Sequence, residues 1–262
     1  MKKITKIVAI IIAFLLIAGL LFVTNAFVGN PISKYLVDKN SDLYIEKQYD
    51  DLNLVKEIRY DFKSTRYYVS LKSETIDDLH FTLYYSLTGQ LERDLYENNI
   101  TNGWNVLTRL DEAYRNETDI IFEQLKSIAL FKNSEHLYTS AHLYSKENIA
   151  EQFGNKNGGI DATSLELDKN YDIAAMGTNG GIIDFSVRFN DHDESFERCA
   201  MALKEIKTCF DEANMGFCFI NIGIINEEGN FAYGIDLISS DQIDDVNLLE
   251  IIKENCNMNY NK

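Results

Sequence analysis

The sequence predicts an α+β protein: a single N-terminal transmembrane helix followed by two small units of antiparallel or mixed sheet covered by helices. The first observation is an uncharged run from Ile7 to Val28, which is long enough to cross a bilayer because a helix rises about 1.5 Å per residue. The second is that apolar residues in several later stretches alternate with polar ones, as in half-buried strands. The third is that in other stretches they recur every three or four residues, as in helices.

The apolar run is interpreted as a signal anchor that stays on the protein. The apolar core of a cleaved signal spans about 7 to 15 residues, and this run is longer. Thr24 and Ala26 form an acceptable cleavage pair, so cleavage stays open as an alternative. The tail before the run carries Lys2, Lys3 and Lys6. Because such a tail resists translocation, residues 1–28 are expected to be a cytoplasmic tail and cell-membrane anchor, with the remaining chain extracytoplasmic.

Composition excludes one class of partner. The chain has 41 acidic and 25 basic residues and a net charge of −16. Nucleic-acid binding needs clustered lysine and arginine, so we expect no nucleic-acid partner. The same charge favours a soluble surface. The expected partners are the membrane, through one helix, and another envelope protein.

The first predicted unit covers residues 29–131. Pro31 lacks a backbone N–H, so the anchor ends before it and a second helix follows as far as Tyr49. Alternation predicts antiparallel strands at residues 57–62, 66–72 and 79–87, with a fourth around 91–95. The helical period returns from Trp104 to Ile128. This helix is expected to cover the apolar face of the sheet, leaving the other face in solvent.

The second predicted unit covers residues 132–262, with the boundary at Lys132-Asn133-Ser134. Glu135 to Tyr144 favours a strand, with a short helix as the alternative. The runs 155–159 and 177–181 are rich in glycine and asparagine and are expected to be loops. Clearer patterns predict a strand at 183–189, a helix at 196–210, strands at 217–225 and 231–237 joined by a hairpin, and a helix at 246–256. This β-α-β-β-α order predicts two helices on one face of a mixed or antiparallel sheet.

The search for a reactive or metal site finds little. The histidines are His80, His136, His142 and His192. On a strand, the second and third of these would lie about 20 Å apart and could not share an ion. The polar run Asn190–Glu194 fails as a calcium loop because Phe196 stands where glycine is required. It is better explained by Asp193 or Ser195 capping the next helix.

No phosphate-binding, dinucleotide-binding, serine-hydrolase or zinc-protease motif is present in the sequence. We therefore predict no catalytic, cofactor-binding or metal-binding residue and no cofactor. The only positions assigned a role are the transmembrane limits, Ile7 and Val28.

Four free thiols are predicted, at Cys199, Cys209, Cys218 and Cys256. The first two lie ten residues apart on one helix, about 15 Å along its axis, whereas a disulfide needs Cα atoms within about 7 Å. The other positions lie among apolar residues of strands and helices, where cysteine is a small core residue. Cys218 with Cys256 is the one bridge that the expected geometry allows.

Several segments resemble the YfjL-like proteins of Gram-positive bacteria. They are Gly29-Asn30-Pro31-Ile32-Ser33, Tyr60-Asp61-Phe62-Lys63, Asp77-Asp78-Leu79-His80-Phe81, Arg109–Arg115 and Glu166–Asp172. Their order and spacing span nearly the whole chain. The cysteines and the asparagine-rich tail of the C-terminal half depart from the family pattern. The resemblance implies a bacterial membrane-anchored protein and brings no catalytic residues with it.

Two functions follow as hypotheses. The favoured one is an anchored extracytoplasmic protein that is not an enzyme and whose α+β units bind a partner. The alternative is an envelope hydrolase that uses carboxylates. An enzyme needs a concave site where titratable groups with displaced pKa values converge, whereas a binding module needs an exposed surface patch.

Overall fold

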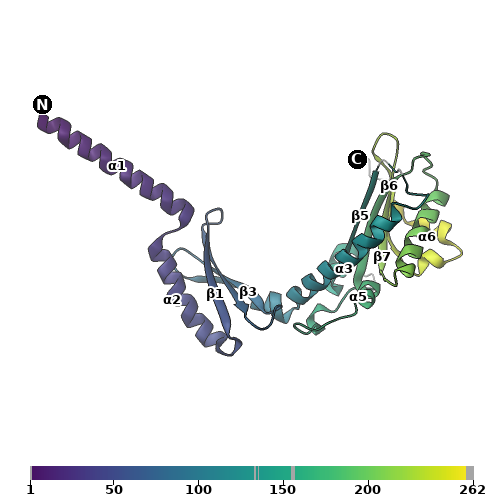
Figure 1. Cartoon of the computed structure of the whole chain (residues 1–262), viewed down its shortest axis with the longest axis horizontal. Coiled ribbons are helices and arrows are strands. Elements are labelled where there is room, and N and C mark those ends of the chain that lie inside the picture. Colours follow the sequence, from purple (N-terminus) through teal and green to yellow (C-terminus); the bar gives the residue numbers. More distant parts are fainter. Residues whose placement is uncertain (1, 133, 135, 155–156, 258–262) are drawn as a thin grey trace. The chain divides into compact units, whose positions relative to one another are not determined.

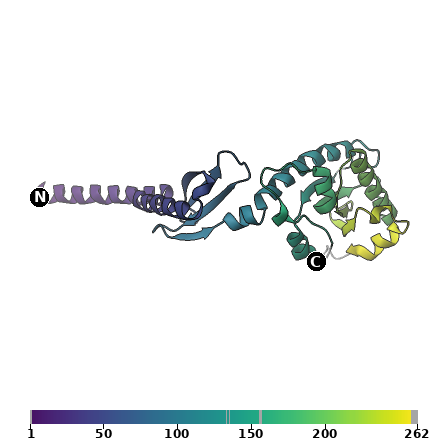
Figure 2. The same cartoon turned by 90° about the horizontal axis from the view of Figure 1, so that it is seen from below.

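The computed structural model describes residues 2–132, 134, 136–154 and 157–257 (Figures 1 and 2). The helices are α1 (Lys2–Val28), α2 (Pro31–Gln48), α3 (Trp104–Leu125), α4 (Lys146–Phe153), α5 (Ile173–Gly180), α6 (Phe196–Glu212) and α7 (Leu248–Asn255). The strands are β1 (Leu54–Asp61), β2 (Arg66–Ser73), β3 (His80–Tyr85), β4 (Leu91–Asp94), β5 (His136–Leu143), β6 (Gly181–Arg188), β7 (Phe219–Ile225), β8 (Phe231–Ser239) and β9 (Cys256–Asn257). The predicted α+β class is confirmed. The described chain forms two units, residues 1–105 and 106–262.

The first unit is an antiparallel sheet in the order β1-β2-β3-β4 with α2 on one face. Alternating residues of β2 and β3 point into its core, which is completed by Val37 of α2. That core consists of Val37, Tyr67, Val69, Leu71, Phe81, Leu83 and Tyr85. The alternation seen in the sequence therefore has a direct cause, because successive side chains of a strand point to opposite faces.

The second helix begins as the proline signal predicts. Asn30 caps α2 with its side-chain oxygen, which accepts a hydrogen bond from the Ile32 N–H at 2.8 Å. Pro31 occupies the first helical position, where no intrahelical N–H bond is needed.

The helix α3 lies in a different unit from the one expected. Its residues Leu110, Tyr114 and Phe122 are buried in the core of the second unit, while the first sheet is covered by α2. The structural division falls between Asn105 and Val106, ahead of the boundary expected at Lys132. An apolar stripe specifies that a helix must cover some sheet, but not which one. Asn133 and Glu135, which belonged to the expected boundary and strand, lie outside the described residues.

The second unit is a mixed sheet in the order β5-β6-β7-β8-β9. Among the strands that the structure describes, β6 and β7 are the one parallel pair, and the connection between them contains α6. The strand at residues 136–143 confirms the strand interpretation of that weak pattern. The predicted β-α-β-β-α order is present as β6-α6-β7-β8-α7. The last helix begins later than the predicted residue 246. Val246 precedes α7 and is 97% exposed, and Leu248 and Ile252 form the buried side of the helix.

The glycine-rich run at 177–181 was expected to be a loop, and that prediction is wrong. Residues up to Gly180 form the end of α5, which begins after an Asp172 cap. A Cβ at Gly177 would lie 2.2 Å from the Gly216 carbonyl oxygen and 2.5 Å from the Tyr114 ring. Gly177 is therefore required because α5 passes too close to its neighbours for any side chain. The conformational freedom of glycine is not needed at this position.

The two faces of the second sheet are covered unequally. Side chains from α3, α6 and α7 pack with Ile183, Phe185 and Ile222 on one face. On the other face a smaller cluster joins Ile149 of α4 to Ile182, Phe219 and Leu237 at one end of the strands. The rest of that second face carries the site described next. Asn155 and Lys156, in the expected loop before it, lie outside the described residues.

Candidate functional site

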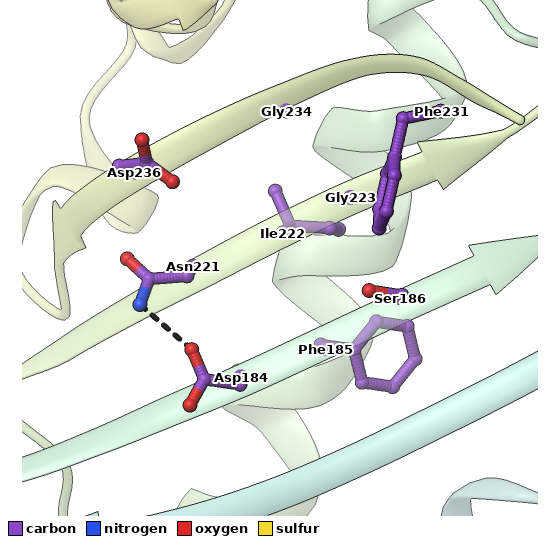
Figure 3. Close-up of a pocket in the computed structure, with 9 residues that line it drawn as sticks. All are labelled: Asp184, Phe185, Ser186, Asn221, Ile222, Gly223, Phe231, Gly234 and Asp236. Atoms are coloured by element: carbon purple, nitrogen blue, oxygen red, sulfur yellow. Dashed lines mark hydrogen bonds between the residues drawn. The ribbon is translucent and has the colours of Figure 1, made fainter. Parts of the chain in front are cut away.

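A hollow of about 280 Å³ opens on the less covered face of the second sheet. It lies across β6, β7 and β8 (Figure 3). Three polar side chains, Asp184, Asn221 and Asp236, gather at one end, and the Phe231 ring stands at the other. Ser186 lies at the same end as Phe231, on the neighbouring strand β6. We call this feature the open-face hollow, lined by Asp184, Phe185, Ser186, Asn221, Ile222, Gly223, Phe231, Gly234 and Asp236.

A β-bulge shapes the polar end of the open-face hollow. Ile220 pairs with Ile238 and Ile222 pairs with Ile235, so Asn221 opposes two residues of β8, Asp236 and Leu237. Leu237 has a φ of 54°, and its N–H donates to the Asn221 side-chain oxygen at 2.8 Å. The extra residue of a bulge loses its regular ladder bond and re-aims neighbouring side chains. The Asn221 side-chain oxygen replaces the lost ladder bond by accepting a hydrogen bond from the Leu237 N–H.

The same asparagine also fixes a carboxylate. Its amide nitrogen donates to Asp184 Oδ1 at 2.8 Å, and the Ser140 hydroxyl donates to Asp184 Oδ2 at 3.5 Å. Using both ends of its amide, Asn221 ties the bulge on β8 to the carboxylate on β6. The polar end of the hollow is thus held by hydrogen bonds across three strands.

The aromatic end of the hollow depends on two glycines that leave space for the Phe231 ring. Gly223 and Gly234 are cross-strand partners. A Cβ on Gly223 would lie 2.5 Å from the Phe231 ring. Any larger residue there would push the ring aside. Phe231 remains 40% exposed, so it presents an aromatic surface to solvent at the end of the hollow opposite the carboxylates.

The open-face hollow carries groups that can recognise a cationic side chain. Carboxylates attract a lysine or arginine through charge, and an aromatic ring attracts the same cation through its face; here the two kinds of group occupy opposite ends of one hollow.

Two other depressions carry less chemistry. A trough of about 770 Å³ follows the solvent face of the first sheet. Its charged groups pair with each other, as in Arg59 with Glu57 at 2.8 Å and Lys72 with Asp77 at 3.6 Å. A second groove, of about 290 Å³, lies between α3 and β5. At its border Asp111 accepts a hydrogen bond from the Leu143 N–H at 2.7 Å.

The histidines are dispersed. His80 is exposed on the solvent face of the first sheet. His142 Nδ1 lies 3.4 Å from the Asp111 carboxylate, and His192 Nδ1 lies 3.6 Å from Glu227. Among residues that the structure describes, no three His, Cys, Asp or Glu side chains are grouped so that they could hold a metal ion.

The polar run Asn190–Glu194 serves the start of α6. Ser195 is the cap, and its hydroxyl accepts a hydrogen bond from the Arg198 N–H at 3.2 Å. Asp193 accepts from the Ser195 N–H at 3.0 Å, and hydrogen bonding to Ser195 lowers the Asp193 pKa. Asp191 pairs with Arg198 at 2.6 Å. The capping interpretation is confirmed.

All four cysteines are free. Cys199 is completely buried, and burial raises its pKa to about 12 despite an opposing hydrogen bond from Tyr233. Burial likewise raises the pKa of Cys209, Cys218 and Cys256. Thiols with raised pKa values are poor nucleophiles at neutral pH, so these side chains are structural.

The sequence did not indicate the open-face hollow. Asp184 and Ser186 occupy the polar positions of an alternating strand, where they look like ordinary solvent-facing residues. Asn221 interrupts an otherwise apolar strand, and that interruption is the single signal from which the polar cluster could have been suspected.

The fold and the hollow define a two-unit α+β protein with an apolar N-terminal helix and a partly polar hollow on a sheet face. Comparison with known families identifies it further. The YfjL-like N-terminal domain model matches residues 4–94, and the YfjL-like C-terminal domain model matches residues 114–253. The chain therefore belongs to the YfjL-like family. No curated protein and no solved structure matches it.

Proposed function

We propose that this chain is a single-pass cell-membrane protein whose folded part lies outside the cytoplasm and binds an envelope partner through the open-face hollow. The observation that carries the anchoring is the environment of α1. Its apolar span, Lys6–Asn25, buries none of its described length against the protein. Phe14, Leu16 and Leu20 are each about 70% exposed. Contiguous apolar surface of this size supports burial of the helix in lipid.

Orientation follows from the charges at the ends of the span. The short tail bears three lysines, whereas the large C-terminal part translocates largely regardless of its charge. Fusing alkaline phosphatase or green fluorescent protein to the C-terminus tests this. An active phosphatase fusion and a dark fluorescent fusion are expected. The reverse pattern contradicts the orientation, and loss of residues 1–28 from the mature protein, measured by intact mass, contradicts the anchor.

The size of the open-face hollow favours one inserted side chain. Ligand pockets for whole small molecules usually span about 300 to 1,000 Å³, and this hollow has about 280 Å³. Asp184 and Asp236 border it, and Phe231 supplies an aromatic wall. We therefore propose that the partner inserts a lysine or arginine side chain into it.

Site-specific photo-crosslinking in intact cells tests the binding role. A photoreactive residue replaces Ser186 in the hollow, and the control places it at Met201, which is 50% exposed on α6 at the opposite side of the sheet. A discrete adduct is expected from the hollow alone, and Phe231→Ala should remove it. The matched surface variant Leu87→Ala, whose side chain is also 40% exposed, should leave it intact. Equal adducts from both crosslinker positions, or an adduct that survives Phe231→Ala, would contradict the role of the hollow.

A further inference from the structure

Specific side-chain and backbone contacts fix the junction between α1 and the first sheet. Gly29 has a φ of 84°, and a Cβ there would lie 2.6 Å from Tyr67 Oη and 2.9 Å from the Tyr60 ring. Tyr67 Oη donates a hydrogen bond to the Asn30 carbonyl at 2.9 Å. The Tyr60 and Tyr67 rings contact each other with centroids 5.0 Å apart. The chain that leaves α1 is therefore packed directly onto β1 and β2.

The loop between β1 and β2 lies beside this junction (Figure 1). The Phe62 ring contacts the Phe27 ring with centroids 5.5 Å apart, although both side chains are at least half exposed. This contact sets Phe62 level with the last turn of α1. Since the span Lys6–Asn25 is about 30 Å long at 1.5 Å per residue, that turn falls at the interface between hydrocarbon and headgroups.

The conformation of the loop is fixed by one carboxylate. Asp61 accepts hydrogen bonds from the Ser64 hydroxyl at 2.7 Å, the Tyr68 hydroxyl at 2.9 Å and the Lys63 N–H at 3.0 Å. A loop held by this many bonds presents Phe62 and Lys63 in a defined direction. Because its residues are already ordered before they meet a surface, the loop loses little conformational entropy on binding.

The exposed residues around the junction have the composition of a membrane interface. Ile32 and Tyr35, in the first turns of α2, are 69% and 65% exposed, and Phe62 is 50% exposed. Lys34 and Lys63, which are sequence neighbours of these residues, are exposed as well. Aromatic rings with an apolar body and a polar edge, next to lysines, are typical of residues at headgroup depth.

We propose that Ile32, Tyr35, Phe62 and Lys63 form a juxtamembrane face that rests in the phospholipid headgroup layer and holds the first unit against the membrane. The occupant is lipid because the face continues the anchor without a linker and pairs apolar rings with cations. This inference rests on the proposed anchoring of α1. It adds that the first unit is held at the bilayer surface. With a single membrane-spanning helix and no further contact, the unit would be free to reorient relative to the membrane.

Tryptophan quenching by brominated lipid tests the juxtamembrane face in the full chain. Trp104, the sole tryptophan, is first replaced by phenylalanine. Phe62→Trp then reports on the face. Glu74→Trp reports on the exposed turn after β2 at the opposite end of the sheet, roughly 25 Å away by the strand rise. Both proteins are reconstituted in nanodiscs of phosphatidylethanolamine and phosphatidylglycerol with bromine near the headgroup end of the acyl chains.

The expected result is quenching and a blue-shifted emission for Phe62→Trp and neither effect for Glu74→Trp. Tyr35→Trp, on the exposed side of α2, repeats the measurement without altering the loop. If neither reporter is quenched more than Glu74→Trp in a full-length, lipid-incorporated protein, the juxtamembrane face is overturned while the anchor stands. If the chain stays outside the nanodisc or its mass lacks residues 1–28, the anchor itself fails, and the juxtamembrane face falls with it.

Discussion

Replacing Gly177 with alanine should destabilise the second unit, although alanine is the better helix former. In an exposed helix the exchange would stabilise by about 1 kcal/mol. Here the added methyl would lie 2.2 Å from the Gly216 carbonyl oxygen and 2.5 Å from the Tyr114 ring, and that ring is fully buried in the core. Overpacking costs about 2 to 3 kcal/mol at such sites. The Tyr114 Oη bond to the same carbonyl, 3.0 Å long, is worth about 1 kcal/mol more.

The net expectation is a loss of about 2 to 3 kcal/mol, which raises the population of the opened unit by roughly 30- to 150-fold at 1.36 kcal/mol per factor of ten. Cys199 is a natural reporter because it is fully buried in the same core as Tyr114. Its alkylation in the full chain, followed by peptide mass spectrometry at low reagent concentration, measures opening. Gly19→Ala, where no atom lies within 4 Å of the added methyl, is the control. A rate for Gly177→Ala within about two-fold of the unchanged protein would refute the close-packing explanation.

Three further outcomes follow from the structure. Burial opposes the charge of Lys56, but hydrogen bonds to Asp38 and Asp42 outweigh burial and raise the Lys56 pKa. The stability that these bonds add to the first unit is therefore fully present below the ordinary lysine pKa of about 10, and it is lost as the pH rises through the pKa of Lys56 in the folded protein. Lys56→Met should cost the first unit about 0.5 to 1 kcal/mol, and unchanged amide exchange in β2 would contradict that. Hydrogen bonds led by the Ser64 hydroxyl lower the Asp61 pKa to about 2, so its contribution is present above about 4 and lost as pH falls through the folded value. Ser64→Ala should move the carboxyl titration measured by NMR upward, and an unmoved midpoint would show that this bond is not responsible. Alkylation of the denatured, unreduced protein should give four adducts, whereas two or none would reveal disulfides.

The sequence predicted elements well where a single face of one element decides its pattern. Strands β2 and β3 bury every second residue against α2, so their alternation is strict. Prediction failed where the structure depends on a neighbour distant in the chain. The stripe of α3 was recognised, but the sheet that it covers was not, because both sheets offer an apolar face. The glycines of α5 resembled a loop because their reason lies at Gly216 and Tyr114.

The candidate site could not be predicted for the same reason. Asp184, Asn221 and Asp236 lie on three strands and come together only through the order β6-β7-β8 and the bulge opposite Asn221. The apolar N-terminal helix was easier to predict, because its length and lack of charge are properties of one continuous segment. That helix was thus readable from local sequence, whereas the polar end of the hollow required the register of the sheet.

Backbone strain occurs beside both proposed surfaces. In the described chain, the non-glycine residues with positive φ are Asn53, Thr65, Asp168, His192, Asn214 and Leu237. Asparagine, aspartate and histidine adopt this conformation comparatively easily, whereas a β-branched or bulky residue pays about 1 to 2 kcal/mol. The two bulky exceptions are Thr65, in the loop that presents Phe62, and Leu237, in the bulge that organises the open-face hollow. Thr65 lies in the turn that joins β1 to β2, and the Leu237 N–H donates to the Asn221 side chain, so each strained residue fixes the backbone beside its surface. Replacing either residue with glycine should therefore relax the backbone, and binding at the hollow or contact with lipid should weaken as the fixed geometry is lost.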